Sequence, residues 1–362
     1  MTSKFLQLHL LTAYPPSNLN RDDLGRPKTA IVGGEERLRI SSQSLKRAWR
    51  TSDVFSNKLR EHIGIRTKQI GRTIYERFLD NKVDIEKAQK WTHDIIKTFG
   101  APKADKKEKS SKEEKAEINF DFIDTEQLVH FSPEEVQGIY SLVDTISKEN
   151  LFDPNKELRV LRNNIKSVDI ALFGRMLADT PEYNIEAAAQ VAHAITVHKV
   201  AVEDDFFTAV DDLNKGDIDA GAGHLGETEF GAGIYYIYLC VDKGLLKENL
   251  SDDGDLANKS LASLIEASAI VSPSGKQNSF ASHARASYLL CELGNQQPRS
   301  LSLAFYAPIK KKPILSEAIT SLKETRKKMD EVYGPCADKI IEMDVEKGSK
   351  TLAECVRFAL ES

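Results

Sequence analysis

RLRISSQSLKRAWR, residues 37–50, carries the strongest structural signals in this chain. Arginine and apolar residues alternate over positions 37–40, which predicts a short strand with one apolar face and one cationic face. Ser41 and Ser42 follow, and both are good N-cap residues, while apolar residues recur after them at helical spacing. We therefore expect a basic strand that runs directly into a capped helix.

The cations of the expected helix lie along one stripe. Gln43, Lys46, Arg47 and Arg50 are spaced i, i+3, i+4 and i+7, so one amide and three cations share a face. Serine hydroxyls and backbone N–H groups at a helix start can also bind an anion. The stripe fits a row of phosphates, although many surface helices carry basic stripes that only face solvent.

The composition limits the class of protein. With 362 residues and 41% apolar content, the chain can bury a large core, as one domain with insertions or as two domains. The formal net charge of −5 argues against a nucleic-acid binder that works through bulk positive charge. Charge is instead local, because residues 1–60 hold 11 Lys or Arg against 5 acids, whereas residues 201–231 hold 9 acids and a single lysine. The two segments are electrostatically complementary.

The sequence predicts no metal, cofactor or membrane partner. Gly221–Gly226 (GAGHLG) matches the dinucleotide fingerprint G-x-G-x-x-G, but it follows an acidic loop rather than a strand and no helical pattern follows it, so we expect no cofactor there. Its cysteines, Cys240, Cys291, Cys336 and Cys355, are widely spaced and form no C-x-x-C pair, so we expect neither a zinc site nor a disulfide framework. The first residues, MTSKFLQLHLL, are too short and too polar for a signal peptide, and no apolar run approaches the length of a membrane span. We expect a cytoplasmic protein with no membrane partner, no metal and no cofactor.

Local patterns predict the elements along the chain. Alternation over 5–11 predicts a first strand, and a loop rich in Pro, Asn, Asp and Gly follows it. A hairpin over 30–40, with its turn at Gly33-Gly34, leads into the basic helix. Helical spacing dominates residues 57–150, where Ser132 and Pro133 mark a strong helix start. Lys103–Glu117 is nearly free of apolar residues and is expected to be mobile.

The second half of the chain alternates helices and strands. We expect, in order, an Ala-rich helix at 185–198, a buried strand at 231–239, a helix at 256–269, a strand at 301–305, and two C-terminal helices from Ser316 that are broken at Gly334-Pro335. A strand, a hairpin and a helix, followed by later strands with a helix between them, predict an α+β fold with a ferredoxin-like core. The remaining segments are insertions into that core.

Phe206 and Phe207 form an unusual pair of adjacent aromatic residues in the acidic segment. On one short helix they cannot both face a core, so at least one is expected to be exposed. An exposed ring can stack on a base or fill an apolar pocket of another subunit. The alternative is a helix with one buried ring and one half-buried ring.

Seven blocks of sequence carry a resemblance to a known family. The blocks are Asn18–Asp23 (NLNRDD), Gly33-Gly34, Arg39–Ala48 (RISSQSLKRA), Val168–Ala171 with Gly174–Met176, His193–Thr196, Phe207–Leu213 and His224–Gly226. They occur in this order in the CasC family, the backbone subunit of the type I-E CRISPR surveillance complex Cascade, which this chain therefore resembles. The resemblance covers most of the chain up to about Tyr238, and the C-terminal third is similar only loosely.

The resemblance implies a non-catalytic protein shaped like a right hand, with an RNA-recognition-like palm, helical fingers and a protruding thumb. Copies would stack head to tail along a CRISPR RNA, alongside other Cascade subunits, and would present its bases to target DNA. The implied division is 1–58 for the first part of the palm, 59–184 for the fingers with 101–117 disordered, 185–199 for a palm helix, 200–230 for the acidic thumb, and 231–362 for the rest of the palm and the C-terminal helices.

The resemblance also implies which residues touch RNA. The RNA backbone would be held by Asn20, Arg21, Lys28, Ser41, Gln43, Lys46 and Arg50. We also expect Arg39 and Arg47, from the same basic strand and helix, to bind RNA. A kinked nucleotide would lie against Met176, Phe206, Phe207 and Thr208. Where the family commonly has Trp, this chain has Phe206, which keeps an aromatic surface and loses the indole N–H donor.

Two other classes of function are compatible with the sequence. Related repeat-associated RNA-binding folds include metal-dependent RNases, and Asp22 or Asp23 in the first loop could supply the acid. The chain could also be a structural oligomer that binds no nucleic acid. RNA cleavage in the presence of magnesium or manganese, and the nucleic-acid content of the purified protein, distinguish these classes.

Overall fold

The protein is described from a computed structural model that covers residues 4–102, 120–154, 166–177, 181–209 and 224–361. The chain divides into two compact units, and each is described by itself. The sheet unit comprises Met1–Lys58, Ala189–Lys243 and Asn258–Ser362, and the helical unit comprises Leu59–Ala188 and Gly244–Ala257. The expected mobile segment Lys103–Glu117 lies outside the described residues.

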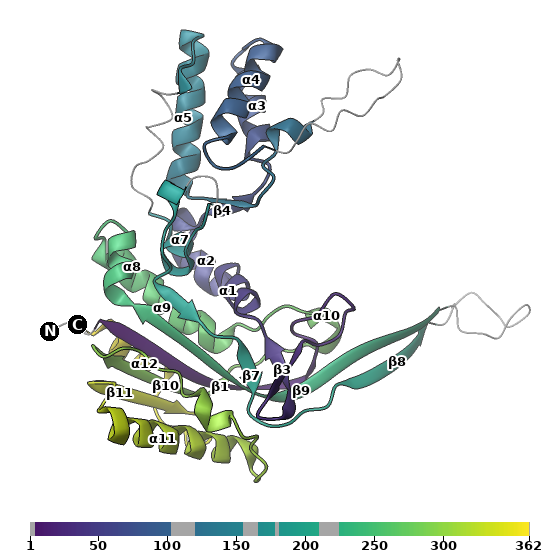
Figure 1. Cartoon of the computed structure of the whole chain (residues 1–362), viewed down its shortest axis with the longest axis vertical. Helices are drawn as coiled ribbons and strands as arrows, with labels where there is room; N and C mark the ends of the chain where they lie inside the picture. Colours follow the sequence, from purple (N-terminus) through teal and green to yellow (C-terminus); the bar gives the residue numbers. More distant parts are fainter. Residues whose placement is uncertain (1–3, 103–119, 155–165, 178–180, 210–223, 362) are drawn as a thin grey trace, which may run out of the picture. The chain divides into compact units, whose positions relative to one another are not determined.

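A large antiparallel sheet forms the centre of the sheet unit (Figure 1). Its main path runs in the order β11-β10-β1-β9-β7-β3-β2, and β6 and β8 also pair with β9. The first strand, β1, therefore lies inside the sheet, between β10 and β9. The strands are β1 (Phe5–Ser17), β2 (Thr29–Val32), β3 (Glu35–Ile40), β6 (Ala189–Val191), β7 (Ala194–Thr196), β8 (Glu203–Ala209), β9 (His224–Asp242), β10 (Ala286–Gly294) and β11 (Lys339–Asp344).

Strand β1 is buried on both faces, whereas alternation of apolar and polar residues is typical of a strand with one buried face. On one face, Leu11 packs with Tyr236 and Tyr288 of the neighbouring strands against Ile319 and Leu322 of α11. The helices of this unit are α1 (Ser42–Arg50), α2 (Asp53–Leu59), α9 (Gly254–Ile270), α10 (Gln277–Phe280), η5 (Ser302–Phe305), α11 (Ile314–Tyr333) and α12 (Leu352–Leu360), and α2 and α9 extend into the helical unit.

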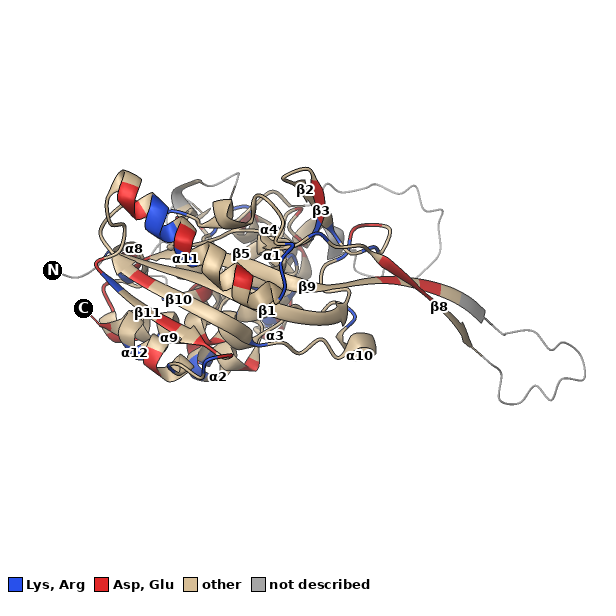
Figure 2. Ribbon diagram, turned by 90° about the horizontal axis from the view of Figure 1, so that it is seen from below, with Lys and Arg blue, Asp and Glu red and all other residues tan. Residues whose placement is uncertain are grey.

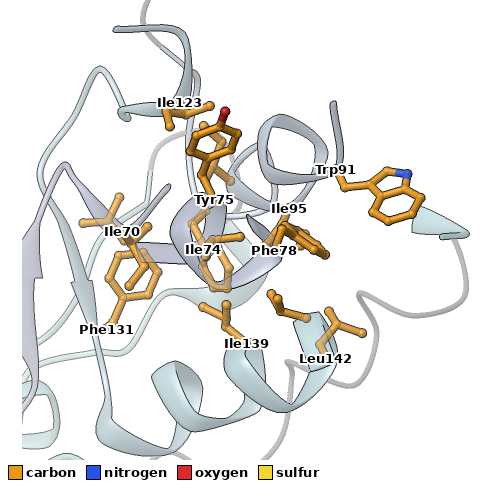
Figure 3. Close-up of a cluster of buried hydrophobic side chains, with 14 of the residues drawn as sticks. Ile70, Ile74, Tyr75, Phe78, Trp91, Ile95, Ile123, Phe131, Ile139 and Leu142 are labelled. Carbon is orange, nitrogen blue, oxygen red and sulfur yellow. The ribbon is translucent and has the colours of Figure 1, made fainter. Parts of the chain in front are cut away.

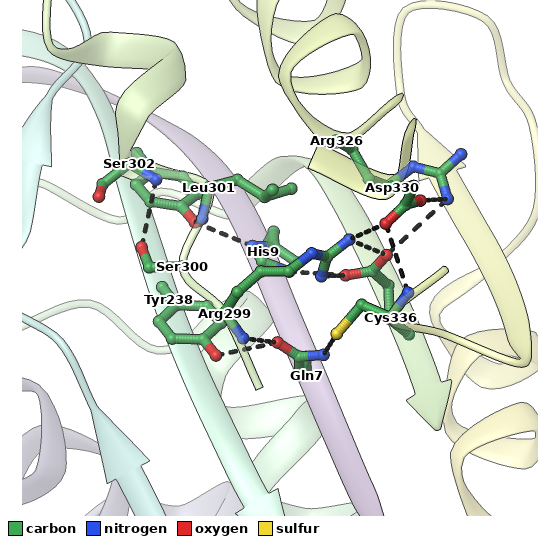
Figure 4. A network of polar contacts seen from close by, with 12 residues as sticks. Gln7, His9, Tyr238, Arg299, Ser300, Leu301, Ser302, Arg326, Asp330 and Cys336 are labelled. Carbon is green, nitrogen blue, oxygen red and sulfur yellow. Dashed lines mark hydrogen bonds and ion pairs between the residues drawn. The ribbon is translucent and has the colours of Figure 1, made fainter. Parts of the chain in front are cut away.

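Polar residues of β1 that lie under α11 form a buried network (Figure 4). Burial lowers the pKa of His9, so its ring is neutral. Because the Glu292 carboxylate only accepts, Nε2 of His9 carries the proton and donates at 3.1 Å, and Nδ1 accepts from the Tyr236 hydroxyl at 2.8 Å. Arg299 donates to the same carboxylate at 2.6 Å. Burial alone would raise the pKa of Glu292, yet the hydrogen bonds from His9 and Arg299 lower it to about 2.

The helical unit has its own apolar core (Figure 3). Ile74 and Phe78 of one helix, Ile95 of the next and Ile139 of a third are all buried in it. The elements are η1 (Arg60–His62), β4 (Ile65–Thr67), α3 (Ile70–Asp80), α4 (Ile85–Ile96), η2 (Phe120–Ile123), β5 (Val129–Phe131), α5 (Pro133–Glu149), α7 (Val168–Phe173), η4 (Pro181–Tyr183) and α8 (Lys243–Asn249). Helix α5 begins with the predicted capping box, in which Ser132 and Glu135 exchange hydrogen bonds with each other's backbone.

The predicted helix over 185–199 is wrong. This segment contains the strands β6 and β7, and Ala189–Val191 pairs with Val241–Leu239 of β9. Alanine favours a helix, but this preference is weak. Backbone hydrogen bonds to strand β9 override it here. Val191, Ile195 and Thr196 are β-branched and suit the sheet.

Two expectations near the C-terminus also need correction. The predicted strand at 301–305 is a 3-10 helix over Ser302–Phe305 with Leu301 as its N-cap, and the buried residues Leu301, Ala304 and Phe305 do not alternate as they would in a strand. Helix α11 does end at Gly334, which has a φ of +86°, but strand β11 separates it from α12. The sequence patterns did not predict β10 or β11, because these strands form by pairing with segments that are distant in the sequence, β10 with β1 and β11 with β10.

Candidate nucleic-acid interface

Helix α1 starts as the sequence predicts. Ser41 is its N-cap, and the hydroxyl of Ser41 accepts a hydrogen bond from the backbone N–H of Ser44 at 3.3 Å. The side-chain oxygen of Asn20 in turn accepts from the Ser41 N–H at 2.8 Å. Leu45 and Trp49 are fully buried beneath the helix. The first loop therefore holds the N-terminus of α1 directly.

The predicted RNA stripe of α1 is unevenly exposed. Gln43 and Arg47 are exposed, whereas Lys46 and Arg50 are half-buried. All four lie away from the side that carries Leu45 and Trp49, so the helix still presents cations outward. Contact of these residues with RNA stays a prediction.

Residues 18–28, which we name the ridge loop, are held by hydrogen bonds from two buried or half-buried side chains. Asn18 is 0% exposed, and its Nδ2 donates to the carbonyl oxygens of Gly25 at 3.0 Å and of Glu229 at 2.9 Å. Asp22 Oδ1 accepts from the backbone N–H groups of Leu24 and Arg26 at 3.0 and 2.9 Å. This oxygen of Asp22 therefore organises the loop.

Two polar cavities flank the ridge loop. The α1-side cavity, about 520 Å³, is lined by Leu19, Asn20, Arg21, Asp22, Asp23, Gly25, Ser44, Arg47, Ala48, Thr51, Pro273, Ser274 and Gly275. The hairpin-side cavity, about 400 Å³, is lined by Asp22, Leu24, Arg26, Pro27, Lys28, Thr29, Glu36, Arg39 and Val202. The structure thus brings Asn20, Arg21 and Arg47 together on one side, and Lys28 and Arg39 together on the other.

Helix α1 turns a different stripe toward its cavity than the sequence suggested. The lining residues are Ser44, Arg47, Ala48 and Thr51, which have the same i, i+3, i+4, i+7 spacing as the predicted stripe but begin one position later. Only Arg47 belongs to both. The sequence also missed Ser274 and Gly275, which are more than 200 positions from the ridge loop and carry no local signal beyond a turn-forming SPSG.

The hairpin-side cavity has a cationic surrounding. Nη1 of Arg39 lies 2.8 Å from Nδ1 of His193, which is exposed on the loop before β7. Burial and the charges of Arg39 and Lys28 lower the pKa of His193, so its ring is neutral and accepts this bond. Cations from the ridge loop and from β3 therefore lie close together at this cavity and would both attract an anion bound there.

The described ends of the acidic segment, residues 203–209 and 224–230, form a two-stranded ribbon rather than a helix. Strand β8 pairs with residues 224–230 of β9, and every residue of β8 is exposed. We name this pair the β8–β9 ribbon, and Figure 2 shows acidic residues on it. Glu203, Asp204 and Asp205 lead into Phe206 and Phe207, whose side chains are 66% and 46% exposed.

Phe206 and Phe207 therefore point to opposite faces of the ribbon, because successive strand side chains alternate. The sequence required at least one exposed ring, and the structure has two. Phe207 lies opposite Gly226, where a Cβ would come 2.3 Å from the ring. Because Gly226 has no side chain, the Phe207 ring can lie over its backbone on the neighbouring strand. Thr208 follows on the same strand and is exposed.

Met176 is presented by a rigid turn of the helical unit. Its side chain is 82% exposed, while Arg175 before it and Leu177 after it are buried. Arg175 donates to both oxygens of Glu135 at 2.9 and 2.7 Å and to the Tyr183 carbonyl oxygen at 3.1 Å. Met176 and the Phe206–Thr208 segment belong to different units, so their meeting at one RNA step stays a prediction.

Neither metal ligation nor a membrane span is visible in the parts of the chain described. Over these ranges, no three His, Cys, Asp or Glu side chains converge as a metal site would require. Likewise, none of the described helices combines the length and hydrophobicity needed to cross a bilayer. Asp22 and Asp23 line the α1-side cavity, but one Asp22 oxygen already accepts two backbone hydrogen bonds.

Comparison with known proteins assigns the chain to a family. A structure described as "CRISPR RNA-guided surveillance complex, pre-nicking" contains a similar chain, with a TM-score of 0.80, 29% identity, and coverage of 98% of this chain and 99% of the other. A second, described as "CRISPR RNA-guided surveillance complex", shares the fold with a TM-score of 0.69, 23% identity and coverage of 98% and 99%. A search of curated protein sequences finds no match. The sequence model of the CT1975-like proteins (Cas_CT1975) matches residues 6–361, and the chain therefore belongs to this family.

Proposed function

We propose that the protein is the CRISPR RNA-binding backbone subunit of a type I-E Cascade surveillance complex. In this role it holds the guide RNA through contacts that carry no sequence information, and pairing of the guide with target DNA supplies the specificity. Family membership and the similarity to a chain of a CRISPR RNA-guided surveillance complex support a Cascade-type role. The finer assignment rests on the interface.

The observation that carries the proposal is the pair of polar cavities on either side of the ridge loop, each of which is lined by cations together with two acids. Arg21 and Arg47 line one cavity, and Lys28 and Arg39 line the other. Arginine and lysine on both sides of one ridge suit a polyanion that crosses it, because successive phosphates can occupy successive cavities. The ridge loop is held by hydrogen bonds from the buried side chain of Asn18, which favours an arrangement formed before RNA arrives.

The β8–β9 ribbon suits assembly of several copies on one RNA. It carries exposed acids and two exposed aromatic rings, whereas the ridge loop and α1 carry cations. When two different surfaces of one chain are complementary, the contact between copies is heterologous and propagates as a filament. We propose that copies stack head to tail on the guide in this way and that other Cascade subunits bind the ends.

The experiment is binding of a fluorescent single-stranded RNA by the purified chain, followed by anisotropy over a range of salt concentrations. Binding should weaken steeply with salt, and Arg21→Ala with Arg47→Ala should flatten that dependence, because about 0.7 counterions are released per single-strand phosphate contacted. Lys327→Ala with Lys328→Ala is the matched control, since it removes two exposed cations from α11. Equal loss in both double variants contradicts the proposal.

The same sample tests the nuclease alternative. After incubation with Mg²⁺ or Mn²⁺, we expect the bound RNA to remain full length. Divalent-dependent cleavage that is lost in Asp22→Asn or Asp23→Asn would replace the proposal with the enzymatic reading. No binding of RNA at any salt concentration would favour the structural oligomer.

A further inference from the structure

The segment Pro273–Gly275 forms a wall of the α1-side cavity to which no role has yet been given. Pro273 is buried, whereas Ser274 is exposed toward the cavity that it lines. The other two walls are the ridge loop and one face of α1, both of which carry proposed RNA contacts. The segment adds a third wall to this open, polar cavity of about 520 Å³.

Close backbone packing fixes this wall against the ridge loop. A Cβ at Gly275 would lie 2.4 Å from the carbonyl oxygen of Leu19 and 2.5 Å from that of Asn18. Real Cβ atoms do not approach this closely, so only glycine permits the two segments to touch. The wall therefore sits at a fixed distance from Asn20 and Arg21, the next residues of the ridge loop.

The other end of the segment is tied to the β8–β9 ribbon. Lys276 has a left-handed backbone, with φ of 45° and ψ of 31°, which a residue with a side chain adopts only when its surroundings impose it. Its Nζ donates to the Thr228 hydroxyl at 2.6 Å. The ring of Phe280 packs 5.9 Å from that of Phe230. These contacts hold the segment in its place beside the cavity.

The lining chemistry selects the ligand. Arg21 and Arg47 favour an anion, and Ser274 offers a hydroxyl donor. Asp22 and Asp23 in the same cavity would repel a bare phosphate, but their carboxylates can accept from a hydroxyl or amino group. A ligand that carries both one negative charge and hydrogen-bond donors satisfies the whole set, and a ribonucleotide step has both.

We propose that Pro273–Gly275 is a third guide-contacting element and that the α1-side cavity holds one ribonucleotide step of the RNA. The phosphate lies at Arg21 and Arg47, the Ser274 hydroxyl donates to a phosphate oxygen, and Asp23 accepts from the ribose 2′-hydroxyl. This inference rests on the proposed RNA-binding function and adds to it a specific site. It also gives the protein a means to favour RNA over DNA as its guide.

The test places a negative charge on the wall. Ser274→Glu should weaken binding of single-stranded RNA by at least about tenfold, because a carboxylate beside a bound phosphate repels it. Ser279→Glu is the matched control, since Ser279 is exposed five positions later and does not line the cavity. It adds the same charge and should bind within about twofold of the wild type. Thermal unfolding of both variants verifies that they are folded.

A second measurement does not depend on affinity. Ser274→Cys should crosslink to an RNA that carries a thiol-reactive group on one phosphate, whereas Ser279→Cys should not. The native cysteines of the described chain are buried, so they give little background. Equal affinities for the two Glu variants, or equal crosslinking of the two Cys variants, overturns the third wall and leaves the proposed function standing. Failure of the wild type to bind RNA overturns the proposed function itself.

Discussion

Asn18 offers a test of the ridge loop that avoids every side chain proposed to touch RNA. It is 0% exposed and cannot reach a ligand, yet its Nδ2 links the Gly25 carbonyl oxygen at 3.0 Å and the Glu229 carbonyl oxygen at 2.9 Å. Asn18→Ala removes both hydrogen bonds. All residues that line the two cavities are left unchanged.

The expected size of the effect follows from those two bonds. A buried hydrogen bond contributes a net ~1 kcal/mol, so the ordered ridge loop loses about 2 kcal/mol. If RNA binds only the ordered loop, and these two bonds supply most of the free energy that orders it, the Kd weakens by up to roughly 30-fold. The salt dependence should not change, because the same phosphates are contacted once the loop is ordered.

The assay is RNA anisotropy at several salt concentrations, with thermal unfolding to verify the fold. Asn258→Ala, an exposed asparagine on α9, is the matched control and should bind as the wild type does. The reasoning is refuted if folded Asn18→Ala binds within about twofold of the control. It is also refuted if the variant loses salt dependence, since that would mean that phosphate contacts rather than loop order were removed.

Further predictions concern α1, Met176, the buried network and the β8–β9 ribbon. Lys46→Ala with Arg50→Ala should weaken binding equally for all RNA sequences and reduce the salt slope by about 1.4, for two single-strand phosphates; an unchanged slope contradicts their assignment. Arg175→Leu should destabilise the helical unit by roughly 3–5 kcal/mol in denaturant unfolding, because it leaves Glu135 buried and unpaired; a loss below about 1 kcal/mol would argue against this. The free energy of unfolding should fall in two steps as the pH decreases. The first step begins below about 6.5, because the unfolded chain then binds a proton at His9 that the folded chain does not, and the second begins below about 4.5 through Glu292, whose pKa of about 2 corresponds to a loss on the order of 3 kcal/mol. An unfolding free energy that does not change between pH 7 and pH 3 would refute this prediction. Met176→Ala with Phe207→Ala should preserve affinity for short RNA but impair capture of target DNA by a reconstituted complex. If these residues kink the guide, one base at each kink does not pair, so the wild-type complex should tolerate target mismatches at regular intervals and the double variant should not. Tolerance at regular intervals that persists in the double variant shows that these residues do not kink the guide.

The parts of the interface that sequence predicts are those with short-range causes. A serine cap followed by helical spacing defines α1, and Gly33-Gly34, both at positive φ, defines the turn between β2 and β3. The acidic composition and the aromatic pair marked residues 200–230 as an unusual surface, although the strands at 203–209 and 224–230 were not foreseen. These features depend on residues a few positions apart, which is the range over which propensity acts.

The parts that sequence missed depend on contacts between distant segments. The 185–199 helix was wrong because pairing with β9 decides that segment. The cavity-facing stripe of α1 begins at Ser44 rather than Gln43, since the ridge loop and Pro273–Gly275 determine which side of the helix is enclosed. The role of Asn18 was also invisible, because its partner Glu229 is 211 positions away. Such positions are found only when the fold is known.

The central claim is that copies of this chain assemble on guide RNA, and native mass spectrometry with RNAs of increasing length tests it most directly. The protein without RNA should be largely monomeric, and the number of copies per RNA should rise in even steps as the RNA is lengthened. Phe206→Ala with Phe207→Ala should still load one copy on a short RNA but add further copies poorly. A copy number that is independent of RNA length, or filaments of equal length without RNA, would contradict the claim.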